Sequence, residues 1–95
     1  MNQVILTARI EEASALRYTP AGIPALDLRL AHESRLQEAG ESRQVMLTVR
    51  ALALGALAES IGRQPLGSQW RFTGFLATPR RGKQVVFHVQ EFQQD

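Results

Sequence analysis

The 95-residue sequence contains no cysteine, which excludes disulfide bonds, thiolate metal sites and thiol catalysis. No apolar run approaches the roughly 18 residues that a membrane-spanning helix needs. The N-terminal segment 1–12 has no basic residue before its apolar stretch, so we expect no secretory signal. A hydrophobic content of 44% and a charged content of 21% are typical of one folded domain. We therefore expect a single cytoplasmic domain over residues 1–95, with no membrane partner.

The residue combinations that support catalysis or metal binding are also missing. The two histidines, His32 and His88, have no third ligand at a recognisable spacing. There is no Ser-His-Asp arrangement in a familiar context, no glycine loop for a phosphate and no evident carboxylate pair. We expect no catalytic residue, no metal and no cofactor, and we do not expect an enzyme.

The excess positive charge lies in the C-terminal third of the chain. Residues 1–60 carry six arginines and seven acidic residues, whereas residues 61–95 carry five basic and two acidic residues. All cationic side chains except Lys83 are arginines, whose planar donor groups suit phosphates and bases. This choice favours an anionic polymer as partner, although a GC-rich genome also raises the arginine content.

A period of two dominates the hydrophobic pattern, which is typical of half-buried strands. In residues 24–32, leucines occupy alternate positions, and similar alternation recurs along the chain. The expected strands are residues 4–10, 24–32, 43–51, 68–78 and 83–92. Tight turns are expected at Thr19–Gly22 and Pro79–Lys83, and the charged segment Glu33–Ser42 is expected to be a mobile loop.

One segment departs from this period. Residues Leu52–Gly62 are rich in alanine and leucine and end at a glycine, which predicts a short helix packed on the core. The resulting order is β-β-β-α-β-β, with the helix between the third and fourth strands. A mainly β, five-stranded OB-fold barrel, closed at one end by that helix, has this order. The rival SH3-like barrel does not place a helix there.

Four segments carry motifs that extend over nearly the whole chain: Pro20–Pro24, Leu36–Gln44, Leu66–Leu76 and Val85–Val89. The most specific motif is QEAG-x-x-RQ at residues 37–44, which leads into the third strand. The pattern G-S-x-apolar-x-apolar-x-G at residues 67–74 is shared more loosely with single-stranded DNA-binding proteins. Together these segments resemble the primosomal replication protein N family, small bacterial relatives of single-stranded DNA-binding protein.

This resemblance implies a homodimeric OB-fold that binds single-stranded DNA during replication restart. It also implies that the protein bridges this DNA to the restart helicase, primosomal protein N′, and stimulates it. A helicase-loading protein is a further candidate partner. The residues of the dimer interface do not follow from the resemblance, but the Ile5 and Leu6 region of an edge strand is a candidate.

The outward residues of the third strand are candidates for DNA binding, because OB-folds bind oligonucleotides across their second and third strands and the flanking loops. If Val49 points into the barrel, Met46 and Arg50 point outward. With the basic turn near Gly82, they form an arginine-rich track for phosphates. The candidate DNA-binding residues are Arg17, Tyr18, Arg35, Arg43, Met46, Arg50, Arg80, Arg81 and Lys83. Arginines scattered over unrelated faces, or paired with carboxylates, would contradict this track.

Aromatic residues are scarce where the resemblance leads us to expect one. Members of the family, and OB-fold single-strand binders in general, place an aromatic residue on the third strand for base stacking. Here that position is Met46, and Glu41 precedes it. Stacking contributes about 1–3 kcal/mol per base, so we expect weak, salt-sensitive binding that depends on arginine. Trp70 alternates with Phe72 and is assigned to the core, whereas Phe75 is left open between DNA binding and a dimer interface.

Two other functions stay open. One is a general single-stranded DNA-binding protein, a paralogue of the housekeeping type. Such proteins carry a long acidic tail, whereas this sequence stops at Asp95, directly after its last expected strand. We therefore expect partners to dock on the barrel or its loops, which favours the accessory role. The other is a protein-interaction barrel with weak DNA binding, which Met46 and Glu41 make credible.

Overall fold

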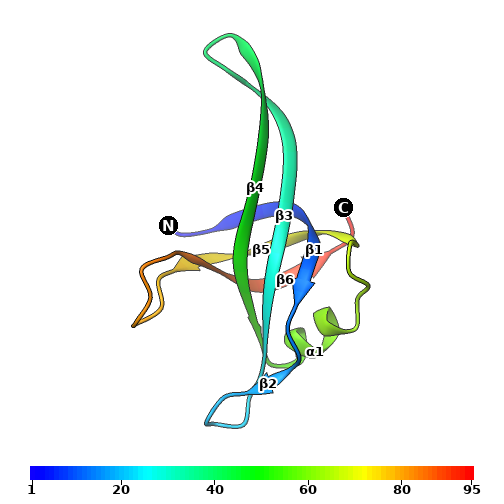
Figure 1. Ribbon diagram of the computed structural model, residues 1–95, viewed down its shortest axis with the longest axis vertical. Coiled ribbons are helices and arrows are strands. Elements are labelled where there is room, and N and C mark those ends of the chain that lie inside the picture. The colour runs from blue at the N-terminus through cyan, green and yellow to red at the C-terminus, as the bar shows by residue number, and fades with distance from the viewer.

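The computed structural model describes residues 1–95 as a closed β-barrel with one short helix (Figure 1). Its elements are β1 (Val4–Ala13), β2 (Arg17–Tyr18), β3 (Pro24–Glu38), β4 (Glu41–Leu54), α1 (Ala56–Gly62), β5 (Gln69–Ala77) and β6 (Val86–Gln93). The barrel strands follow the order β1-β5-β6-β4-β3, and β3 pairs with β1 to close the ring. The short strand β2 adds to β3 outside this ring. The five-stranded ring, with α1 between β4 and β5, confirms the predicted OB-fold.

Two irregularities in the strands allow the sheet to close on itself. β1 pairs with β5 through residues 4–9 and with β3 through residues 9–13, and its register shifts just after Ile10. The pairing of β5 with β6 shifts at Gly74. Such bulges bend a strand and increase its twist, as closure of a small barrel requires.

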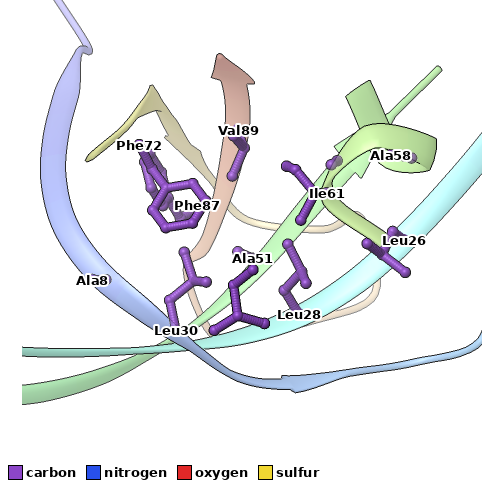
Figure 2. Packing of buried hydrophobic residues seen from close by; sticks show 12 residues of the cluster. Ala8, Leu26, Leu28, Leu30, Ala51, Ala58, Ile61, Phe72, Phe87 and Val89 are labelled. Carbon is purple, nitrogen blue, oxygen red and sulfur yellow. The ribbon is translucent and has the colours of Figure 1, made fainter. Parts of the chain in front are cut away.

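Apolar side chains from every barrel strand and from α1 form one core (Figure 2). The largest fully buried side chains are Phe72, Phe87, Ile10, Leu26, Leu30 and Ile61. β4 contributes the small residues Ala51 and Ala53. Successive side chains of a strand point to opposite faces, so the neighbours of a core-facing residue in β4 point to the outer face of the barrel. Burial of Ala51 therefore directs Arg50 to the outside of the barrel.

The charged segment 33–42, expected to be a mobile loop, belongs to a long hairpin. β3 and β4 remain paired as far as Glu38 and Glu41, and a two-residue turn joins them. The turn residues Ala39 and Gly40 have φ of 54° and 81°, as a type I′ hairpin turn requires. Residues 32–47 pair with no other strand, and we call this projecting ribbon the arm (Figure 1). The loop prediction was wrong because charge alone does not prevent two facing strands from pairing.

The helix is shorter than expected. Residues 52–54 continue β4, where Ala53 is buried opposite Leu26, and α1 begins only at Ala56. Gly55 separates them with φ of 74° and ψ of −148°, a conformation that suits glycine. Ile61 of α1 is buried in the core, so the helix covers one end of the barrel as predicted. α1 is far shorter than a bilayer-crossing helix, and the fold contains no other helix.

Candidate nucleic-acid interface

A groove of about 590 Å³ crosses the outside of the barrel beside the hairpin that joins β5 to β6. That hairpin is the orange loop at the left of Figure 1. The charged and polar residues along the groove are Arg17, Asp27, Arg50, Lys83, Gln84 and His88. The arginines and the lysine outnumber the one carboxylate, so the groove favours an anionic ligand. We call it the cationic groove.

Arg50 lies in the groove because the alternation of β4 turns it outward. On the outer face it lies opposite Arg29 of β3. Arg50 forms no ion pair, although its charge helps to lower the pKa of the nearby Asp27 carboxyl. Its guanidinium is therefore available to a phosphate.

Arg17, in contrast, is held by Asp27. The predicted turn at Thr19–Gly22 is present, with the N–H of Gly22 donating to the carbonyl of Thr19 at 2.8 Å, and it pairs β2 with β3. The Nε and Nη2 groups of Arg17 donate to the two carboxylate oxygens of Asp27 at 2.7 and 3.1 Å. These hydrogen bonds lower the pKa of Asp27 below its usual 3.8 and raise the pKa of Arg17. Asp27 therefore occupies the side of Arg17 that a phosphate needs.

The basic turn between β5 and β6 has the expected hairpin geometry. The N–H of Gly82 donates to the carbonyl of Pro79 at 3.1 Å. Pro79, Gly82 and Lys83 line the groove, whereas Arg80 and Arg81 are exposed at the tip. None of the three cations of this turn forms an ion pair. All three are available to an anion that lies along the hairpin.

The arm places its candidate residues on two different faces. Met46 is 66% exposed and lies opposite Glu33 on the outward face of β4. Arg35 shares this outward face and forms no ion pair. Arg43 lies on the other face, where its Nε is 2.6 Å from a carboxylate oxygen of Glu38. Arg43 and Met46 therefore lie on opposite faces of the arm, because odd and even residues of β4 point to opposite sides, and a role of Arg43 in DNA binding stays a prediction.

Tyr18 lies apart from the cationic groove. It is 63% exposed and lines a separate depression beside α1, together with Leu16. Its neighbour Arg17 faces the groove, and successive residues of a strand point to opposite sides. Stacking on Tyr18 would require a DNA strand that passes around the β2 end of the barrel.

Trp70 and Phe75 of β5 lie in different environments. Trp70 packs against the core, its Nε1 donates to Ser68 Oγ at 2.9 Å, and its ring meets Phe92 edge-on at 4.9 Å. This confirms the assignment of Trp70 to the core. Phe75 lies on the outer face, where its ring stacks on His88 with the centroids 4.8 Å apart.

Two further residues of this region, Asp27 and Arg29, are not among those predicted from the sequence. Asp27 is the only acid that lines the cationic groove. Arg29 lies opposite Arg50 and 3.6 Å from Glu12, so it adds a second arginine to the outer face. Both occupy outward positions of the alternating segment 24–32, and that parity was readable from the sequence. The register that places Arg29 opposite Arg50 could not be predicted from the sequence, because it depends on how the two strands pair.

Most of the expected cations form no ion pair: Arg35, Arg50, Arg80, Arg81 and Lys83. Arg17 and Arg43 are paired with acids, and of the unpaired cations Arg50 and Lys83 line the groove. No three histidine, aspartate or glutamate side chains gather as a metal site requires. A closed five-stranded barrel with a cationic groove over β4 and the β5–β6 hairpin defines an OB-fold of the oligonucleotide-binding type.

Comparisons with known proteins agree with this class and indicate a particular family. The family described as "another single-strand binding protein family" matches residues 2–91. The replication restart protein PriB of Bordetella pertussis is 48% identical over 92 residues, which cover 96% of this chain and 86% of the relative. The PriB of Nitrosomonas europaea is 40% identical over 91 residues, which cover 95% of this chain and 84% of the relative.

Solved structures show the same fold. PriB from Ralstonia solanacearum superposes with a TM-score of 0.90 at 34% identity, covering 99% of this chain and 97% of that chain. The single-stranded DNA-binding protein from Thermus aquaticus superposes with a TM-score of 0.78 at 28% identity, covering 98% of this chain and 49% of that chain. The chain belongs to the PriB family of replication restart proteins.

Proposed function

We propose that this protein binds single-stranded DNA in the cationic groove as an accessory of replication restart. The observation that carries the proposal is the convergence of Arg50 from β4 and Lys83 from the β5–β6 hairpin on one groove. A flexible polyanion needs such fixed cations along its path, because phosphate contacts supply most of its non-specific affinity. The replication-restart setting is supported by the name that the PriB relatives carry.

Binding is expected to be weak and salt-sensitive. Met46 stands on the outward face of β4 without the ring that a base stacks on. Arg17 must exchange Asp27 for a phosphate before it contributes. The affinity therefore depends on few free cations, and screening by salt weakens each of their contacts.

A titration of fluorescent oligo-dT at several salt concentrations tests the DNA-binding proposal. Replacing Arg80, Arg81 and Lys83 with alanine is expected to flatten the slope of log K against log salt by about two units, because each single-strand phosphate contact contributes about 0.7. Arg63→Ala is the matched control, since Arg63 forms no ion pair and lines the separate depression beside α1. An unchanged slope in the triple variant would place the hairpin away from the phosphates.

A second candidate function is a protein-interaction barrel with little DNA binding. Two observations favour it: Met46 replaces a stacking ring, and Asp27 already occupies Arg17. The same titration separates the two functions. No binding of oligo-dT at about 50 mM salt, where phosphate contacts are strong, would select the interaction barrel.

Within the DNA-binding function, we propose that the protein bridges single-stranded DNA to the restart helicase and stimulates it. The test is a pull-down of that helicase with and without single-stranded DNA, combined with its unwinding rate. Retention of the helicase and faster unwinding are expected, and a helicase-loading protein is tested in the same assay. DNA binding with neither effect would indicate a general single-strand-binding paralogue instead.

We also propose that two copies pair through the N-terminal half of β1. Residues 4–8 pair with β5 on one side only, because the pairing with β3 begins at Arg9. His32 Nδ1 donates to the carbonyl of Thr7 at 2.6 Å, so the backbone groups of Thr7 point away from β5, and those of Ile5 share this direction. Ile5→Pro removes one free donor from this edge and is expected to yield monomers in analytical ultracentrifugation, whereas an intact dimer would contradict the interface.

A further inference from the structure

A second depression adjoins the cationic groove on the outside of the barrel. Its volume is about 400 Å³, and it is lined by Leu52, Leu54, Leu57, Phe75, His88, Val89 and Gln90. We call it the apolar depression. It shares Leu52 and His88 with the cationic groove, so one ligand on this surface reaches both.

The strand register explains why the two cavities meet. Leu52 of β4 lies opposite Asp27 of β3 on one side and His88 of β6 on the other. His88 in turn lies opposite Phe75 of β5, and the two rings stack 4.8 Å apart with 14° between their planes. One row across the outer face therefore passes from the charged groove to a pair of stacked rings.

The Phe75–His88 pair differs from the other rings of β5 and β6. Those other rings lie in or against the core: Trp70, Phe72, Phe87 and Phe92. Phe75 and His88 are only half-buried, and Leu54 in the same depression is 46% exposed. This combination leaves a concave apolar surface open to an external planar group.

We propose that the apolar depression holds one nucleobase of a single strand whose phosphates lie in the cationic groove, with the Phe75–His88 pair as the stacking surface. This inference rests on the proposed DNA-binding function. The apolar depression is continuous with the cationic groove, and this identifies its ligand. A ligand that places a phosphate at Arg50 and Lys83 and a flat ring in the adjoining depression is a nucleotide. The site supplies the base stacking that Met46, which has no ring, does not provide. It accepts any base, because every base has a flat aromatic face.

The experiment compares oligo-dT with an abasic oligonucleotide of the same length, which keeps the phosphates and removes the bases. The wild-type protein is expected to bind oligo-dT about 5- to 20-fold more tightly than the abasic strand. The double variant Phe75→Leu and His88→Leu keeps an apolar surface without rings, and it is expected to lose most of this preference. Because His88 also lines the cationic groove, phosphate binding is compared in the single variant Phe75→Leu, whose affinity for the abasic strand and salt slope are expected to stay unchanged. Leu66→Ala is the control, since Leu66 is 65% exposed and lines neither cavity.

The outcomes separate this inference from the function on which it rests. Binding of both strands with equal affinity by the wild type, or a preference that survives in the double variant, would overturn the base site and leave phosphate binding intact. Binding of neither strand would overturn both proposals. A change of oligomeric mass in the double variant, without a change in base preference, would show that the depression receives a second copy.

A second variant keeps the test valid if the double variant fails to fold. Leu54→Trp adds a ring at a position that is already exposed, so it leaves the core untouched. It is expected to tighten oligo-dT binding about fivefold without altering binding of the abasic strand. Equal effects on both strands, or none on either, would place the bases elsewhere.

Discussion

The cationic groove and the arm both include part of the same strand, β4, yet only at the groove does this strand pack on the core. Arg50 is followed by buried Ala51, and the strand at that point pairs with β3 and β6. The arm is a two-stranded ribbon with no strand beyond it, and such ribbons are marginally stable alone. In both regions, the alternation of the strand turns some side chains outward. Only where the strand packs on the core is such a charged side chain held in a defined position.

The two regions also differ in charge. The arm carries Glu33, Glu38 and Glu41 against two arginines, and one of these arginines is paired with Glu38. Along the groove, Asp27 is the one acid beside three cationic side chains. An anionic strand therefore gains more in the groove than on the arm, and the variants below compare the two regions.

The largest expected effect contrasts two glycines. A Cβ on Gly74 of the barrel would lie 1.8 Å from the carbonyl oxygen of His88, whereas a Cβ on Gly40 of the arm turn would meet nothing within 4 Å. Gly74→Ala is expected to lower the free energy of unfolding by about 3 kcal/mol or more through overpacking. Gly40→Ala is expected to cost about 1 kcal/mol, from its positive φ alone. Urea unfolding measures both variants. A larger loss of unfolding free energy in Gly40→Ala than in Gly74→Ala would contradict the tighter packing of the barrel.

The next effect concerns arginines on the two regions. Arg50→Ala is expected to weaken oligo-dT binding about tenfold at low salt, because it removes a free cation from the groove. Arg43→Ala is the matched variant, and its ion pair and opposite face predict less than a twofold change. Fluorescence titration at one salt concentration suffices. Equal losses would mean that DNA follows the arm as closely as the groove.

A ring on the outward face of the arm tests whether DNA extends beyond the groove. Met46→Trp is expected to tighten oligo-dT binding about fivefold by adding a stacking surface. Leu36→Trp places the same ring on the other face of the arm, opposite Arg43, and is expected to change little. The same titration measures both variants. Unchanged affinity in Met46→Trp would confine the strand to the barrel.

The smallest binding effect concerns the acid in the groove. Asp27→Asn removes the charge that competes with a phosphate for Arg17, so we expect about threefold tighter binding of oligo-dT and a salt slope steeper by about 0.7. Titration at several salt concentrations measures both quantities. Weaker binding would mean that Asp27 positions Arg17 for DNA rather than withholding it.

The same pair makes a small, pH-dependent contribution to stability. The hydrogen bonds from Arg17 lower the pKa of Asp27 in the folded protein below the usual 3.8. The pair therefore stabilises the fold above that pH, and the stabilisation is lost as the pH falls through the lowered pKa. Both side chains are about half-exposed, so solvent screens the pair. The free energy of unfolding of the wild type is therefore expected to exceed that of Asp27→Asn by less than about 1 kcal/mol near neutral pH. Urea unfolding along a pH series checks that this difference vanishes in acid.

The sequence alone determined the faces of the strands and the order of the elements. Alternation is a local property, so the outward direction of Met46 and Arg50 and the core position of Trp70 followed without knowledge of any partner strand. The turn at Thr19–Gly22 and the order of five strands around one helix were equally local, and they led to the OB-fold. The same parity places Arg43 on the face opposite Met46.

The tertiary structure decided which residues of different strands become neighbours. Residues 52–54 suit a helix or a strand, and pairing with β3, joined by β6 at Leu52, made them a strand. The register of that pairing set Arg29 against Arg50, and the closure of the barrel brought Lys83 to the same groove. The stacking of Phe75 on His88 likewise needed the register of β5 and β6. Each of these neighbours belongs to a distant part of the chain, and register and closure depend on the free energy of the whole barrel rather than of any one strand.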